Sequence, residues 1–218
     1  MRTTRTRTTR ALGALALTAA LTFTAACGND DAGSAATSSS EISTTEHNDA
    51  DVEFASNMLQ HHAQALSMVD LTQGRTLDSE VQQLAEQIRD AQAPEIETFT
   101  DWLTEWDEEV PETMRDHANA GHDMDEMDES TDGMDHDGMD HGDMPGMMTA
   151  DDMSALEDAS DEEFQTMWLE MMVEHHEGAV EMAKTQQSDG QFKAAVDLAG
   201  DIVESQTAEI ETMEALLS

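Results

Sequence analysis

Apolar side chains recur three or four residues apart between residues 52 and 69, and again between residues 81 and 103. This step places them along one face of a helix. Gly74 follows the first of these stretches, where a helix is expected to end. Pro94 lies within the second and predicts a kink or break in that helix. The pattern therefore predicts a first helical hairpin over residues 50–110.

The same arrangement returns later in the chain. Met58–Met68 matches Met172–Met182, and Leu84–Phe99 matches Leu198–Met213 at the same offset. A constant offset in two separated segments indicates that one helical hairpin has been duplicated. The second copy lies within residues 149–218, where a short helix with Thr149 as its N-cap precedes it. Two hairpins that each bury one apolar face predict an all-α four-helix bundle.

A long segment of different composition separates the two copies. Residues 111–148 have almost no aliphatic side chains and are dense in Met, His, Asp and Gly. Thioethers favour Cu(I) or Ag(I), imidazoles bind either oxidation state of copper, and such a segment gives methionine no core to fill. We therefore expect a flexible copper-binding segment; the alternative is an acidic linker whose ligands are incidental. Its candidate ligands are Met114, His117, His122, Met124, Met127, Met134, His136, Met139, His141, Met144, Met147 and Met148.

Each repeat also carries two adjacent histidines, His61-His62 and His175-His176. Neighbouring helical residues point about 100° apart, so the second histidine falls on the apolar face and the first lies beside it. The further candidates are the methionines three before and seven after each first histidine, and one glutamate on each following helix: Met58, Met68, Met172, Met182, Glu95 and Glu209. These residues predict either an ordered metal site or a buried hydrogen-bonding network.

The N-terminus predicts export. Residues 1–26 have four arginines followed by an uncharged, mostly apolar run that is short for a membrane span, as in a signal peptide. The run ends in Thr24-Ala25-Ala26-Cys27, which resembles a bacterial lipobox with threonine in place of the usual leucine. Lipidation of Cys27 would anchor the protein at the outer face of the cell membrane, and residues 27–49 have the composition of a flexible tether. Cys27 is the only cysteine, which excludes an internal disulfide and a thiolate metal site.

Charge limits the classes of partner. The formal net charge is −40, which disfavours nucleic acid and anionic lipid and attracts cations. The sequence has no phosphate-binding glycine loop and singles out no catalytic triad, so we expect no enzyme. The residues three before the paired histidines are not carboxylates, which argues against a di-iron oxidase.

The repeated motifs resemble a known family. The motifs are Met58 with His61-His62 and Met68, Gln92 with Glu95-Ile96 and Trp102-Leu103, Met171-Met172 with His175 to Ala179 and Met182-Ala183, and Gln206 with Glu209-Ile210. With them, residues 51–217 resemble the bacterial exported ferritin-like family called domain of unknown function 305. The resemblance implies an exported four-helix bundle, and some members are implicated in copper binding and resistance. It implies no agreed set of ligands.

Residues and resemblance together favour a cell-surface lipoprotein that binds or buffers a copper or silver ion in metal tolerance. The first alternative is a non-catalytic envelope module whose histidines and glutamates form a buried network. A cuprous oxidase is a further alternative that nothing in the sequence requires. No particular protein partner is indicated.

Overall fold

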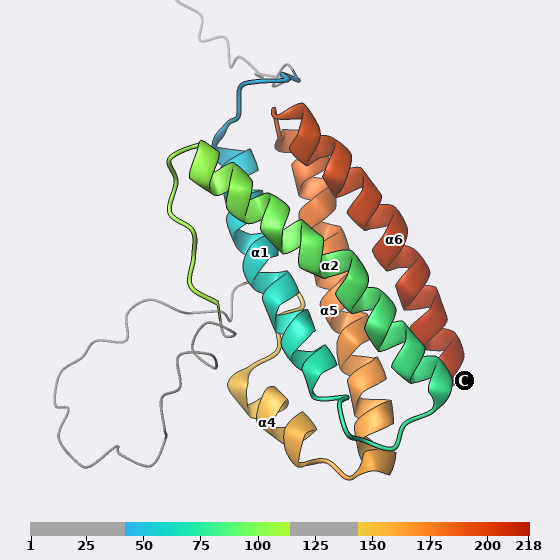
Figure 1. The fold of residues 1–218 in the computed structure, drawn as a ribbon. Helices are drawn as coiled ribbons and strands as arrows, with labels where there is room; N and C mark the ends of the chain where they lie inside the picture. The colour runs from blue at the N-terminus through green and yellow to red at the C-terminus, as the bar shows by residue number, and fades with distance from the viewer. Residues whose placement is uncertain (1–41, 114–143) are drawn as a thin grey trace, which may run out of the picture. The chain divides into compact units, whose positions relative to one another are not determined.

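The computed structural model describes residues 42–113 and 144–218 (Figure 1). These residues form five helices and no strand beyond one isolated bridge. The helices are α1 (Asp49–Asp70), α2 (Ser79–Glu105), α4 (Ala150–Asp158), α5 (Asp161–Asp189) and α6 (Lys193–Leu217). The predicted all-α bundle is confirmed, with α1, α2, α5 and α6 as its four long helices. Among the described residues, no helix has the length and apolar character needed to cross a membrane.

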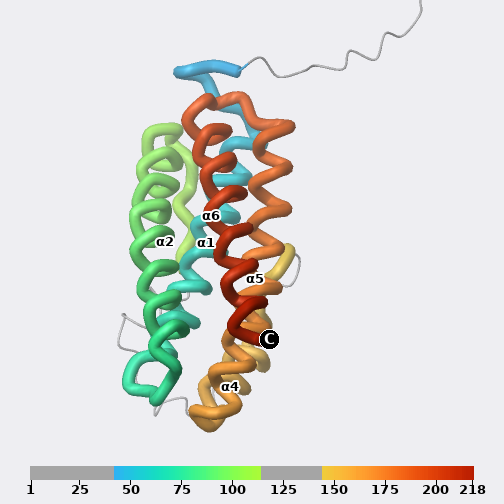
Figure 2. Tube along the Cα trace, turned by 90° about the vertical axis from the view of Figure 1, so that its right-hand side faces the viewer, coloured from blue at the N-terminus to red at the C-terminus, as the bar shows by residue number. Residues whose placement is uncertain are grey.

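The two hairpins, α1–α2 and α5–α6, join along α1 and α5. These two helices are antiparallel. The indole Nε1 of Trp168, early in α5, donates to the carbonyl of Met68, late in α1, at 3.0 Å. At the other end the amide Nε2 of Gln186 donates to Asp51 at 2.5 Å. Figure 2 shows α4 at the end of the bundle where α1 ends and α5 begins.

The apolar core falls into two clusters. The α4-end cluster contains Met68, Trp168 and Leu156, the last of which comes from α4 itself. The opposite cluster contains Phe54, Phe99 and other buried side chains of all four long helices. Polar side chains that lie between the two clusters therefore have apolar side chains toward both ends of the bundle.

Local signals explain where several helices begin. Asn48 caps α1 in a capping box with Asp51, and Thr149 caps α4 in a second capping box with Asp152. The predicted N-cap at Thr149 is therefore confirmed. Gly74 lies in the loop after α1 with a φ of 80°, a backbone conformation that favours glycine.

Of the kink or break predicted at Pro94, the break does not occur, because α2 runs without interruption from Ser79 to Glu105. Proline lacks an N–H, so the carbonyl of Asp90, four residues earlier, has no helical donor. Asp90 and Pro94 both lie on the exposed side of α2, where water can bond that carbonyl. Buried residues on both sides of the proline, including Ile88 and Phe99, anchor the two halves of the helix in the core.

The last residues of the segment predicted as a tether contact the second hairpin. Ser43 accepts a hydrogen bond from the amide of Lys193 and donates one to the carbonyl of Gln191, both at 2.7 Å. The side-chain amide of Asn48 donates to the carbonyl of Asp189 at 2.9 Å. The approach to α1 is thus attached to the turn between α5 and α6.

Candidate metal centre

The first histidine of each repeat meets its counterpart where α1 crosses α5. The imidazole rings of His61 and His175 lie 3.7 Å apart, centroid to centroid, with their planes tilted by 41°. Their side chains are buried, at 0% and 1% exposure. We call these two residues the inner pair. One histidine comes from each hairpin, so the pair lies at the joint between the two copies.

The second histidines point elsewhere, each into its own hairpin. Nε2 of His62 lies 2.7 Å from a carboxylate oxygen of Glu95, and Nε2 of His176 lies 2.9 Å from one of Glu209. A ring that donates through Nε2 keeps its Nδ1 lone pair when it is neutral. Neither Nδ1 has a partner within the described part of the chain. Each glutamate therefore orients one buried imidazole, as carboxylates do both behind the histidine ligands of metal sites and in polar networks.

Burial keeps the inner pair uncharged. Desolvation lowers the pKa of His61 to about 3, and repulsion from His62 adds to the effect. Desolvation also lowers the pKa of His175 well below its ordinary value, with repulsion from His61 as the next cause. A neutral imidazole is the form that donates a lone pair to a metal ion.

The inner pair has spare hydrogen-bonding capacity. Nε2 of His61 donates to the carbonyl of Pro145 at 3.1 Å, which leaves its Nδ1 free. Among the described residues, Nδ1 of His61 and both ring nitrogens of His175 have no partner. Buried polar groups are nearly always paired, so unpaired ones in a native fold point to a bound ion, water or ligand.

Residues 144–148, which we call the strap, cover the inner pair. Gly146 has a φ of 75° and passes so close to α5 that a Cβ there would lie 2.6 Å from the carbonyl oxygen of Glu174. A Cβ on Gly178 of α5 would overlap the carbonyl group of Pro145. The side-chain amide of Gln64 makes two 2.8 Å hydrogen bonds to the backbone of Met148. The glutamine thus binds the strap to α1, and the two glycines allow the strap to approach α5 closely.

The methionines predicted beside the histidines do not gather at one point. Met68 and Met172 belong to the α4-end cluster, whereas Met58 belongs to the opposite cluster, against which Met182 packs while partly exposed. Of the predicted insert ligands, Met148 is buried at 7% exposure, and Met144 and Met147 are partly buried. The other insert candidates, Met114 to His141, and Cys27 lie outside the described residues.

The donor set fits a soft ion better than a hard one. Within residues 42–113 and 144–218, no three His, Cys, Asp or Glu side chains are grouped so that they hold a metal. Zinc sites in proteins use three or four such ligands. Imidazole, which the inner pair supplies, suits copper ions, whereas calcium and magnesium prefer carboxylate, carbonyl and water oxygens.

Several residues that the structure singles out are not among the ligands predicted from sequence. Gln92 and Gln206 are 2% exposed, and at least one amide atom of each lacks a partner in the described region. The Gln-x-x-Glu spacing, which occurs in both repeats, is the sequence pattern from which these two glutamines could have been identified. Pro145, Gly146 and Gln64 carried no signal of their own, because their role depends on a contact between distant parts of the chain.

Comparisons with known proteins agree with this architecture. Residues 51–217 match the family model described as Domain of unknown function (DUF305). A DUF305 protein from Streptomyces coelicolor is 32% identical, with a TM-score of 0.61 over 77% of this chain and 91% of that one. A DUF305 fragment from Deinococcus radiodurans is 26% identical, with a TM-score of 0.62 over 78% and 96%.

A third solved structure is that of a metal-bound protein. CopM in its Cu(II)-bound form is 27% identical, with a TM-score of 0.56 over 77% of this chain and 95% of that one. CopM has also been solved in Cu(I)-bound and Ag-bound forms. A comparison with curated proteins gives no match. The family match spans both repeats and the joint between them, and the chain belongs to the DUF305 family.

Proposed function

We propose that this protein is exported and binds copper, or the chemically similar silver ion, at the inner pair. The observation that carries the proposal is the pair itself: two buried, neutral imidazoles from different hairpins, with three ring nitrogens that have no partner among the described residues. The related protein CopM, solved with Cu(II), supports the same class of ligand.

The rest of the chain supports the same proposal. The acidic charge raises the local concentration of cations, and the segment over residues 111–148 supplies soft ligands. The end of this segment is the strap, which contacts His61 directly. We therefore propose that the segment captures the ion and that the inner pair retains it. A signal peptide and a lipid on Cys27 would place this buffering outside the membrane, in a role in metal tolerance.

A Cu(I) competition titration against a chromophoric chelator tests the proposal. We would compare the mature chain after Cys27 with a deletion of residues 114–143 and with the double variant His61→Gln/His175→Gln. The deletion stops at residue 143 because Met148 and the strap belong to the fold. His47→Gln is the matched control, since His47 stacks on Trp106 and is not part of the inner pair.

We expect competition by the wild type and by His47→Gln, and a clear loss of the tightest binding in the double variant. Unchanged binding in the double variant, with loss in the deletion, would move the function to the segment. No competition by any of the four proteins would overturn copper binding.

One observation favours a second function, that of a non-catalytic structural module. The His62–Glu95 and His176–Glu209 pairs are short, part-buried hydrogen bonds of the kind that scaffolds use. In that case copper would leave the thermal midpoint of the protein unchanged, because only ligands that bind the native state raise it.

A further inference from the structure

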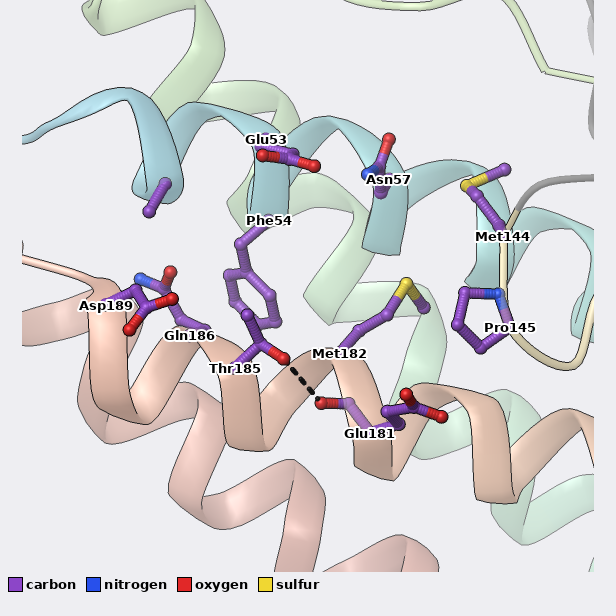
Figure 3. Close-up of a pocket in the computed structure, with 11 residues that line it drawn as sticks. Glu53, Phe54, Asn57, Met144, Pro145, Glu181, Met182, Thr185, Gln186 and Asp189 are labelled. Atoms are coloured by element: carbon purple, nitrogen blue, oxygen red, sulfur yellow. Dashed lines mark hydrogen bonds between the residues drawn. The ribbon is translucent and has the colours of Figure 1, made fainter.

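A groove runs along the outside of the bundle between α1 and α5, next to the inner pair. It has a volume of about 270 Å³, and its walls are the first half of α1 and the last half of α5. Met144 and Pro145 of the strap close one end (Figure 3). We call it the outer groove.

The duplication explains why this groove is open. At the α4 end, α1 and α5 are covered by Met148 and by Leu156 of α4, so Met68 is fully buried there. Met182 occupies the same position in the second repeat, but no part of α4 reaches it, and it lines the outer groove instead. The groove is therefore the half of the α1–α5 joint that Met148 and α4 do not cover.

The lining has the chemistry of a site for a soft cation. Figure 3 shows the thioether of Met182 pointing away from α5 into the space between the helices, toward the end where Met144 lies. Glu53 and Glu181 stand at the rim and are exposed, so they attract cations without being buried charges. Thioether sulfur then selects a soft monovalent ion over the harder cations that carboxylates alone would retain.

A second observation indicates that the groove receives a ligand. Gln186 lines it and is 2% exposed, and its Oε1 has no hydrogen-bond partner within the described residues. Its Nε2 is already used by Asp51, so the amide is fixed with its oxygen unsatisfied. An unsatisfied buried oxygen favours a cation or a hydrogen-bond donor at this end of the groove, which Figure 3 shows to be opposite to Met144.

We propose that Met144 and Met182 form an outer binding site for a soft monovalent cation, from which the ion passes beneath the strap to the inner pair. The two sites share one residue as their boundary: Pro145 lines the groove, and its carbonyl accepts the hydrogen bond from His61. An ion in the groove is thus one peptide group away from the ring that would receive it. This inference rests on the proposed function, because the inner pair is the destination.

Residue-resolved NMR of the mature chain during an Ag(I) titration tests the outer site. Isotope-labelled methionine methyl groups report the groove, and labelled histidine rings report the inner pair. We expect the methyl signals of Met144 and Met182 to shift together, while that of Met213, buried in the core, stays in place. The other ligands of the chain do not interfere, because each signal belongs to one residue.

The double variant Met144→Leu/Met182→Leu tests the passage between the sites. Leucine keeps the volume of methionine and removes its sulfur. We expect the inner-pair rings to load with Ag(I) more slowly than in the wild type, because the groove then has no thioether to hold the soft ion. Met153→Leu is the matched control, because Met153 packs partly buried on the α4 side.

The outcomes separate this inference from the proposed function. Ring signals that respond while the two methyl signals stay fixed would overturn the outer site and leave the inner site standing. Methyl signals that respond while the rings do not would overturn the passage and the inner site together. Equal loading rates in the double variant and in Met153→Leu would also overturn the passage.

Discussion

Adjacent residues of one motif have opposite surroundings in this protein. His62 has a carboxylate at 2.7 Å, whereas His61 faces another histidine and one carbonyl group. The difference arises from the rotation of about 100° between neighbouring helical residues. Sequence reasoning found this divergence and the partner glutamates. It could not identify what the first histidine faces, because that depends on how the two hairpins dock.

The inner pair should make stability depend on pH. In the folded state His61 stays neutral down to about pH 3, whereas an unfolded histidine takes up its proton near 6.5. The folded form binds fewer protons, so the contribution is complete above pH 6.5 and is lost as the pH falls below it. For His61, linkage gives a loss of about 2 kcal/mol in the free energy of unfolding by about pH 5, and the lowered pKa of His175 contributes a further loss of the same sign.

Urea denaturation between about pH 8 and pH 5, a range in which ordinary carboxylates stay ionised, checks this prediction. The double variant His61→Gln/His175→Gln is the reference, because its carboxylates titrate as in the wild type. Its free energy of unfolding should fall less over this range. Parallel pH profiles for the two proteins would show that the pair does not stay neutral in the fold.

At the scale of the elements, the sequence pattern correctly predicted the features that depend on nearby residues only. The two hairpins, the cap at Thr149 and the loop glycine at 74 follow from side-chain periodicity and backbone preference. Pro94 was misjudged because its local cost is offset by core contacts on either side of it. The strap was missed because its ordering depends on hydrogen bonds to residues of α1 that are distant in the sequence.

The variant Gly178→Ala should displace the strap. The new Cβ would overlap the carbonyl group of Pro145, and Nε2 of His61 would lose its acceptor. We expect a loss of about 1–3 kcal/mol in the free energy of unfolding, as for other overpacked sites. Limited proteolysis should also cut near residues 144–148 more readily than in the wild type.

Gly200→Ala provides the control for this change. Gly200 is also helical, but a Cβ there meets only the end of the flexible Gln187 side chain, at 3.2 Å. Alanine favours helix by about 1 kcal/mol over glycine, so this variant should be neutral or slightly more stable. If Gly178→Ala behaved in the same way, the close approach of the strap would not be a constraint.

At the scale of the whole molecule, the bundle consists of two hairpins that meet along α1 and α5. Each His–Glu pair lies within one hairpin, whereas the inner pair joins the two. An ion bound by His61 and His175 would therefore crosslink the hairpins. Because the unfolded chain has no such preformed pair, the ion should stabilise the entire fold.

Thermal melting in buffered Ag(I) checks the crosslink. At a free ion concentration about 100 times the dissociation constant, the expected gain is about 2.7 kcal/mol. We would use the chain that lacks residues 114–143, so that only the bundle binds the ion. The gain should be clearly smaller in His61→Gln/His175→Gln on the same background, where only the outer groove is left to bind the ion. A midpoint that does not rise with Ag(I), or that rises equally in both proteins, would contradict the crosslink.

The attachment of the strap also bears on how this protein arose. Gln64, which bonds the strap, and Gly178, which leaves room for it, occupy the same position of the two repeats. Two identical hairpins in a symmetric dimer would carry the same residue at both places, and each site would need a glutamine and a glycine at once. In one chain that contains both copies, the two positions carry different residues, so the conflict does not arise. A symmetric dimer of one hairpin could bring two histidines together at its axis, but a single chain with two unlike copies can cover one face and leave the other open.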